Sequence, residues 1–133
     1  MRLMSETWQQ SPRGVAEQLV ARGSVYDVGT MERIYDEDQV LLFVEPNGSV
    51  RRAGRAETIA LFRRWAEEGA DPLLTEAEFL HVDEHEDHAV ILLRRRMRAE
   101  EPSSLYELRL RNHGGVWRVS GETITPWIPD DRS

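Results

Sequence analysis

Two side chains on or directly after predicted strands carry groups that suit proton-transfer chemistry, and Glu45 is the first of them. It shares strand parity with Leu41 and Phe43, so it faces the same side of the strand as two apolar residues. If that side lines a cavity, burial raises the pKa of the carboxyl group and makes Glu45 a candidate general base near neutral pH. The alternative is a solvated Glu at the start of a hairpin turn, where charged residues are usually exposed.

Tyr106 is the second candidate catalytic residue. It alternates with Leu108 and Leu110, while Glu107 and Arg109 take the opposite face of the strand. This alternation predicts that the Tyr106 ring points toward a core or a cavity, where its hydroxyl group needs a hydrogen-bond partner. That partner is a neighbouring core residue, a water molecule or a ligand, and on a ligand the hydroxyl group would stabilise a developing oxyanion.

Several other side chains are candidates for positioning a substrate. Arg22 lies on one helical stripe with Leu19 and Tyr26, so its forked donors can bind an anionic ligand, or its head group can pair with Asp27. Tryptophan rings can stack on a flat ligand, although packing in the core is the usual role for residues placed like Trp65 and Trp117. The predicted substrate-binding residues are Arg22, Tyr26, Phe43, Trp65 and Trp127, with Trp127 at the cavity mouth.

An acidic stretch with three histidines raises the question of a metal site. His81, His85 and His88 lie among Asp and Glu residues, and imidazole and carboxylate are ordinary metal ligands. Their spacing spans a strand end and a turn, so the side chains should fan outward, and the pattern is not a helical HExxH motif. A solvated acidic turn is the preferred interpretation, and no metal or other cofactor is predicted.

A run of arginines follows on the next strand. Alternate residues of a strand point to opposite faces, so Arg94, Arg96 and Arg98 are expected on the outer face of the sheet, where they can pair with Glu107 or a second subunit. Charges in such a row also discourage random association between sheets.

Composition narrows the function classes. The 133 residues include 24 acidic and 17 basic side chains, for a formal charge of −7, and an acidic chain argues against nucleic-acid binding. Every basic residue is Arg, so lysine Schiff-base chemistry is excluded. Without Cys there is no disulfide and no thiolate catalysis.

Targeting signals are not apparent in the sequence. Residues 1–14 contain no apolar segment typical of a secretory signal. No apolar run approaches the roughly 20 residues that cross a bilayer. We therefore expect no membrane association and a cytoplasmic protein.

Helices are expected mainly in the first half of the chain. Ser11 and Pro12 mark the start of a helix that runs to Gly29, and Thr30 caps a short second helix. A third helix begins at Gly54 and ends before Pro72.

Strands dominate the rest of the chain. A hairpin is expected from residues 39–44 and 50–53, and four longer strands at residues 73–82, 89–97, 105–111 and 116–128. Short turns between consecutive strands indicate an antiparallel meander. The predicted fold is therefore α+β: a curved antiparallel sheet wrapped around three N-terminal helices, with a cone-shaped pocket between them, as in a cystatin-like roll. Residues 1–11 are predicted to be a flexible segment, residues 12–128 one domain, and residues 129–133 a tail.

Five short segments in order carry a resemblance to a known superfamily. They are Tyr26-Asp27-Val28-Gly29, Tyr35-Asp36-Glu37-Asp38, Glu45-Pro46-Asn47-Gly48, Gly54 to Ile59 with Phe62, and His113 to Val119. With them the chain resembles the nuclear transport factor 2-like superfamily, which includes SnoaL-like polyketide cyclases, ketosteroid isomerases and scytalone dehydratase.

This resemblance implies roles for particular positions. Ketosteroid isomerases have an acidic base before a Pro in the first hairpin, where Glu45 stands here. Tyr106 stands at the position of their protonated acid, which is an oxyanion donor, and Arg22 at the position of their donor Tyr. The resemblance also implies a homodimer through the outer sheet face, where Val90 and Leu92 share parity with the arginine row.

Two functional hypotheses follow. The first is a pocket protein for a small-molecule ligand: a cofactor-independent lyase, isomerase or cyclase acting on an apolar or aromatic substrate. The second is a non-catalytic ligand-binding or dimeric association module. The sequence itself does not decide between them.

Overall fold

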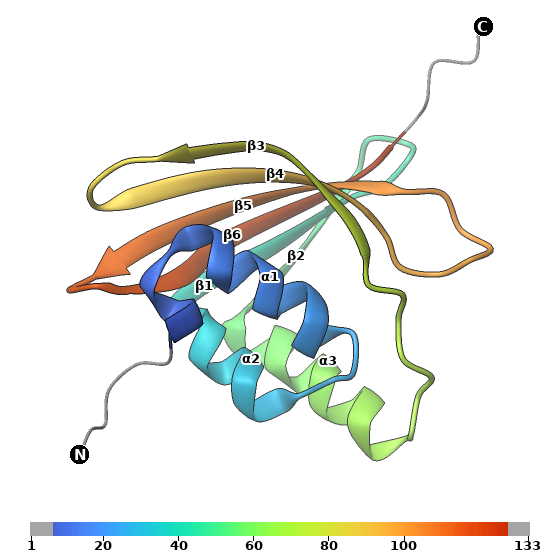
Figure 1. The fold of residues 1–133 in the computed structure, drawn as a ribbon. Helices are drawn as coiled ribbons and strands as arrows, with labels where there is room; N and C mark the ends of the chain where they lie inside the picture. The colour runs from blue at the N-terminus through green and yellow to red at the C-terminus, as the bar shows by residue number, and fades with distance from the viewer. Residues whose placement is uncertain (1–6, 128–133) are drawn as a thin grey trace, which may run out of the picture.

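Three α-helices pack against one face of a six-stranded sheet in the computed structural model, which describes residues 7–127 (Figure 1). A short 3-10 helix precedes the first α-helix. The elements are η1 (Thr7–Gln10), α1 (Pro12–Gly23), α2 (Val28–Ile34), β1 (Tyr35–Val44), β2 (Val50–Gly54), α3 (Arg55–Glu67), β3 (Glu76–Glu84), β4 (His88–Arg96), β5 (Ser104–His113) and β6 (Val116–Pro126).

The first two helices begin at side-chain caps. The Ser11 hydroxyl oxygen accepts a hydrogen bond from the Gly14 amide at 3.0 Å, and Pro12 follows at the first helical position. The helix ends at Gly23, six residues earlier than the sequence predicts, because the chain turns at Tyr26, whose φ is +58°. Asp27 then caps α2 by accepting from the Thr30 amide at 3.2 Å. Gly29 therefore lies inside the second helix.

Helix α3 starts where the sequence predicts. The Glu57 carboxylate accepts a hydrogen bond from the Gly54 amide at 2.9 Å, and the Thr58 hydroxyl donates to the Gly54 carbonyl at 2.8 Å. Ile59 is buried against the core, and Phe62 packs at its edge. The helix therefore presents one apolar side to the sheet.

The sheet has the strand order β2-β1-β6-β5-β4-β3. Strands β3 to β6 form the predicted antiparallel meander, and β1 and β2 form the predicted hairpin. Strand β1 pairs with β6 in parallel, with Phe43 opposite Ile124, so the sheet is mixed. The long segment between these two strands allows the parallel pairing.

A β-bulge in β6 changes which residues face the helices. Arg109 pairs with Gly121 and Leu110 pairs with Val119, so Ser120 is an extra residue between the two pairs. The alternation of faces therefore restarts after Ser120. Val119 before the bulge and Glu122 after it are both buried, although they are three residues apart.

The core lies between the helices and the sheet. Its largest fully buried side chains include Met31, Ile34, Ile91 and Leu108. The 3-10 helix η1 joins this core, because Trp8 packs against it. Residues 7–11, which belong to the segment predicted to be flexible, form this 3-10 helix and the cap of α1. Residues 1–6 and the predicted tail, 129–133, lie outside the described residues.

The predicted fold class is confirmed: the chain is α+β, and its curved sheet wraps around the three helices (Figure 1). Within residues 7–127, no helix has the length and apolar character needed to cross a membrane.

Candidate functional site

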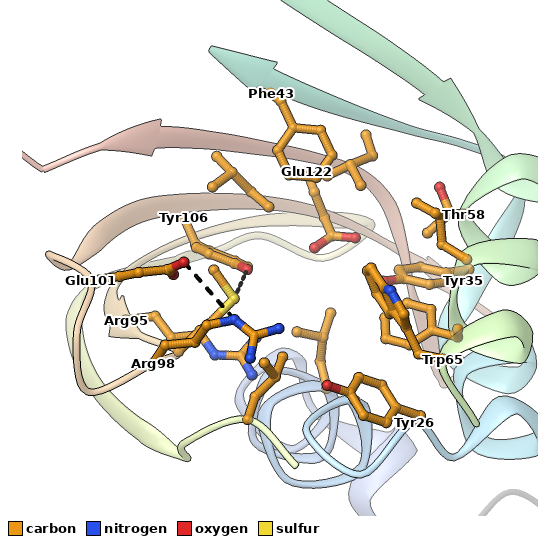
Figure 2. Close-up of a pocket in the computed structure, with 18 residues that line it drawn as sticks. Tyr26, Tyr35, Phe43, Thr58, Trp65, Arg95, Arg98, Glu101, Tyr106 and Glu122 are labelled. Atoms are coloured by element: carbon orange, nitrogen blue, oxygen red, sulfur yellow. Dashed lines mark hydrogen bonds and ion pairs between the residues drawn. The ribbon is translucent and has the colours of Figure 1, made fainter. Parts of the chain in front are cut away.

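A cavity of about 280 Å³ lies between the helices and the concave face of the sheet (Figure 2). Most of its lining is apolar, and its polar groups come from strands β1, β4, β5 and β6, from helix α3, and from the segments that join α1 to α2 and β4 to β5. The lining residues are Leu19, Gly23, Tyr26, Tyr35, Leu41, Phe43, Thr58, Leu61, Phe62, Trp65, Leu73, Arg95, Met97, Arg98, Glu101, Tyr106, Glu122 and Ile124.

Glu122 is the buried acid of this pocket. It lies on β6 between Leu41 of β1 and Leu108 of β5, and only 3% of its surface is exposed. Burial among apolar side chains raises the pKa of its carboxyl group from 4.5 to about 7, although Tyr35 and the charge of Arg95 act to lower it. Its Oε1 atom has no hydrogen-bond partner among the described residues. Glu122 can therefore exchange a proton near neutral pH.

Two tyrosine hydroxyl groups lie near this carboxyl group. Figure 2 shows the Glu122 carboxyl group between Tyr106 and Tyr35 in projection. Burial raises the pKa of Tyr106 to about 12, and burial together with Glu122 raises the pKa of Tyr35 well above its usual value. Both hydroxyl groups therefore keep their protons and remain hydrogen-bond donors. The Tyr106 hydroxyl donates to the Met97 sulfur at 3.1 Å, which is a weak acceptor.

Arg95 brings a positive charge to the same pocket. Its side chain is 4% exposed, its Nη2 donates to the Ser24 hydroxyl oxygen at 2.8 Å, and its Cζ lies 5.4 Å from the centre of the Tyr106 ring. The Nε–H group has no acceptor among the described residues. The guanidinium is thus held in place by Ser24, the residue that caps the end of α1, and it keeps one unused donor.

Aromatic rings form the helical wall of the pocket. Phe62 and Trp65 of α3 pack edge to face, with ring centres 5.8 Å apart, and Tyr26 lies 5.6 Å from Trp65. The Tyr26 hydroxyl donates to the Asp71 carbonyl at 2.8 Å, so this residue offers the pocket its ring. The wall suits a flat or apolar ligand.

The structure brings four of the seven sequence candidates to the pocket: Tyr26, Phe43, Trp65 and Tyr106. Glu45 is not among the lining residues. It follows the last residue of β1 at the hairpin turn, where its carboxylate forms an ion pair with Arg51 at 2.7 Å. The cavity that Phe43 lines therefore does not extend as far as Glu45.

The other two candidates also lie outside the pocket lining. Arg22 lies in the last turn of α1, where its guanidinium pairs with the Asp27 carboxylate at 2.8 Å, the alternative that the sequence left open. Trp127 follows β6 and lies under Arg94, whose Cζ is 5.7 Å from the indole ring. Neither side chain reaches the cavity.

The three consecutive arginines of β4 alternate between the two faces of the sheet: Arg95 faces the pocket, and Arg94 and Arg96 face outward. Arg94 and Arg96 pair with Glu78 and Glu76 of the neighbouring strand β3, and Glu107 pairs with Arg109. The prediction for Arg98 is wrong, because β4 ends at Arg96 and the chain then turns. Arg98 lines the pocket and lies 3.9 Å from Glu101.

The histidine-rich turn forms local contacts. His88 contacts the Asp87 carboxylate at 2.7 Å, and the rings of His85 and His88 stack 4.6 Å apart. Across residues 7–127, no group of three or more His, Asp and Glu side chains is arranged to hold a metal ion.

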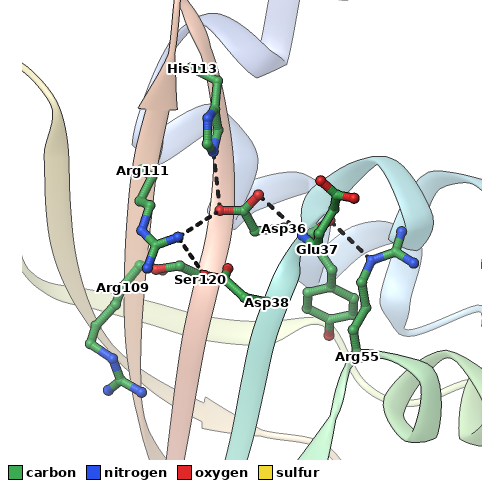
Figure 3. A network of polar contacts seen from close by, with 9 residues as sticks. Asp36, Glu37, Asp38, Arg55, Arg109, Arg111, His113 and Ser120 are labelled. Atoms are coloured by element: carbon green, nitrogen blue, oxygen red, sulfur yellow. Dashed lines mark hydrogen bonds and ion pairs between the residues drawn. The ribbon is translucent and has the colours of Figure 1, made fainter.

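A polar network ties β1 to the end of β5 away from the pocket (Figure 3). The Asp36 carboxylate contacts His113 at 3.1 Å and Arg111 at 3.4 Å, and Arg111 also donates to Asp38 at 2.7 Å. The hydrogen bond from Arg111 lowers the pKa of Asp38. These contacts join strands that are not neighbours in the sheet.

Comparisons with known proteins show the fold. No family model and no curated protein matches the chain. Solved structures do match it. A nuclear transport factor 2-like protein of unknown function from Silicibacter pomeroyi has a TM-score of 0.68 at 18% identity, over 86% of this chain and 92% of that one.

Two further structures agree with that similarity. A domain of unknown function with a cystatin-like fold from Nostoc punctiforme has a TM-score of 0.64 at 18% identity, over 96% of this chain and 83% of that one. A Thiobacillus denitrificans protein, provisionally named as a calcium/calmodulin-dependent protein kinase type II association domain, has a TM-score of 0.69 at 17% identity, covering 92% and 100%. The chain therefore has a nuclear transport factor 2-like fold, as its sequence segments suggest, and these identities show the fold alone.

Proposed function

We propose that the protein binds a small, largely apolar molecule in this pocket and catalyses a cofactor-independent proton transfer, as a lyase, isomerase or cyclase does. The observation that carries the proposal is the buried carboxyl group of Glu122, with a pKa of about 7, in an aromatic cavity. A base whose pKa lies near the working pH combines sufficient basicity with a sufficient ionised fraction. Glu122 takes the role that the sequence gave to Glu45.

The surrounding groups suit such a reaction. Ionised Glu122 removes a proton from a substrate carbon, and negative charge develops on a substrate oxygen. The Tyr106 hydroxyl group donates a hydrogen bond to that oxygen in place of the Met97 sulfur, so a weak hydrogen bond is exchanged for a charge-assisted one. Protonated Tyr35 remains beside the carboxyl group.

Ring opening of nitrobenzisoxazole tests the proposal without knowledge of the natural substrate. A base removes the ring C–H proton, the C–H electrons form the nitrile, and the N–O bond breaks to release a coloured phenolate. We expect the protein to accelerate this reaction, with a rate that rises with pH and levels off above about pH 7. A rate that matches free carboxylate in buffer at every pH would rule against the proposal.

A second candidate function is association between copies of the chain through the outer sheet face. Val90 and Leu92 are half-buried there, among strands that otherwise carry ion pairs such as Arg94–Glu78. The provisional name of the similar Thiobacillus denitrificans protein also refers to association. On this proposal the pocket and a homodimer interface occupy opposite faces of one sheet.

Sedimentation velocity tests the homodimer. We expect wild-type protein to sediment as a dimer and Leu92→Glu to sediment as a monomer, because the new carboxylate would be buried next to Glu107 on the neighbouring strand. Leu74→Glu is a matched control, since Leu74 is exposed and lies before β3. Monomeric wild-type protein at high concentration would contradict this candidate.

A further inference from the structure

The guanidinium of Arg95 is a buried cation that forms no close ion pair among the described residues, although its charge acts on Glu122 in the same cavity. Among residues 7–127, no carboxylate oxygen lies within 4.0 Å of its nitrogen atoms. Buried charges are normally paired, because removing a charge from water is unfavourable unless an opposite charge or several hydrogen bonds replace the water. Within the described residues, the charge of Arg95 is therefore compensated only at longer range, by Glu122, and its Nε–H group has no acceptor.

The position of Arg95 is nevertheless well defined. Its Nη2 is fixed by the Ser24 hydroxyl, which itself donates to the Val20 carbonyl of α1. The Tyr106 ring lies against the guanidinium, and the Nε–H group has no acceptor. A planar guanidinium with a fixed orientation and an unused donor is suited to bind a carboxylate.

We propose that the natural ligand is a small aromatic carboxylate whose carboxylate group binds Arg95 and whose ring packs against Trp65. This inference rests on the proposed function, because it names the substrate class of the same pocket. Figure 2 shows Arg95 and Arg98 on the opposite side of the pocket from Trp65 and Tyr35. Glu122 lines the same cavity as Arg95 and Trp65, so a ligand bound to both would share the cavity with the carboxyl group that exchanges a proton.

The other groups of the pocket favour a singly charged ligand. Arg98 lies 3.9 Å from Glu101 and its side chain is 44% exposed, so solvent and this carboxylate both weaken its attraction for a ligand. Ionised Glu122 repels a second negative charge. The cavity, about 280 Å³, is slightly smaller than the roughly 300 to 1,000 Å³ typical of sites for drug-sized ligands. A monocarboxylate fits this balance better than a phosphate ester.

Isothermal titration calorimetry with phenylpropionate and its neutral isostere phenylpropionamide tests the inference. We expect wild-type protein to bind the carboxylate about 10- to 100-fold more tightly than the amide, as a charge-assisted hydrogen bond predicts. Arg95→Met should lose this preference while keeping the apolar stem. Arg94→Met is the matched control: it removes the preceding arginine, which faces the outer side of the same strand and pairs with Glu78, and it should keep the preference.

Three results would overturn the inference. They are equal binding of acid and amide by the wild type, an unchanged preference in Arg95→Met, and tighter binding of phenyl phosphate than of phenylpropionate. The comparison of acid and amide needs only the wild type, so it decides even if Arg95→Met does not fold. Nitrobenzisoxazole is uncharged, so accelerated ring opening without carboxylate preference rejects this inference and leaves the proposed function standing.

Discussion

Replacing Glu122 by Gln is expected to lower the rate of nitrobenzisoxazole ring opening by about 10²- to 10⁴-fold, the usual contribution of a positioned general base. Gln has nearly the same shape as Glu and keeps one carbonyl oxygen, but it cannot accept the substrate proton. The pocket should therefore keep its form while its chemistry is lost. The rate of phenolate release, measured by absorbance at several pH values, gives the comparison.

Glu45→Gln is the matched control for this experiment. It makes the same chemical change on a carboxylate that pairs with Arg51 outside the pocket lining, so the rate should stay at the wild-type value. If the two variants are slowed equally, or if Glu122→Gln keeps the wild-type rate, Glu122 is not the base. Circular dichroism of both variants shows whether each retains the native fold.

The same substitution is expected to stabilise the folded protein above neutral pH. The pKa of Glu122 is about 7 in the folded state against an ordinary value of 4.5, so the folded protein holds a proton that the unfolded chain has released between these values. The free energy of unfolding therefore decreases as pH rises from about 4.5 to about 7, by about 3 kcal/mol at about 1.4 kcal/mol per pH unit. Because Gln does not titrate, the Glu122→Gln variant does not undergo this decrease in the free energy of unfolding.

Urea unfolding of wild type and Glu122→Gln at several pH values measures the effect. The variant should become the more stable protein as the pH rises, with a difference that grows by about 3 kcal/mol between about pH 4.5 and pH 8 and then levels off. Taking the difference between the two proteins removes the titration of carboxylates that they share, such as Asp27 and Asp38, whose pKa values are lowered. A difference that stays constant with pH would show that Glu122 titrates normally.

Glu122 is therefore expected to support catalysis and, when ionised, to lower the stability of the folded protein. An ionised Glu122 in an apolar cavity costs stability, and a Gln or an apolar residue at this site would be more favourable for folding alone. A buried acid with an unpaired Oε1 is therefore more readily explained by chemistry than by packing. Arg95 is a second case of the same kind in the same pocket.

The architecture is largely readable from residue types along the chain. Caps at Ser11 and Gly54, turns at Gly48 and Gly114, and the alternation around Tyr106 all correspond to local features of the structure. Each of these signals acts within a few residues of its own position, so it survives without knowledge of the tertiary fold. The parallel pairing of β1 with β6 depends on residues about 80 positions apart in sequence and has no such local signal.

Strand alternation alone does not place Glu122 in the pocket. Counting alternate positions from Val119 puts Gly121 and Thr123 inside and Glu122 outside. The bulge at Ser120 reverses this order, and a bulge is formed by the pairing with β5. The one local sign is Gly121, whose absent side chain leaves room for Arg109: a Cβ atom there would lie 2.5 Å from its Nη2.

The alternation that places Arg94 and Arg96 on the outer face of the sheet also predicts that Arg95 lies on the inner face. Ile91 and Leu93 are buried on the inner face of β4, and Arg95 continues that alternation. The prediction that Glu45 lines the pocket has a different weakness. Alternation with Phe43 indicates the face of the strand, but it does not show where along the strand the cavity ends. Alternation identifies a face of the sheet, whereas the extent of a pocket depends on where the helices cover that face.

Titration of the Glu122 side chain by nuclear magnetic resonance tests the central claim most directly. The carboxyl carbon, assigned by its absence from the spectrum of Glu122→Gln, should change its chemical shift with a midpoint of about pH 7. A midpoint near 4.5, the ordinary value for Glu, would show that this carboxyl group is not held in an apolar pocket and would contradict its role as a base.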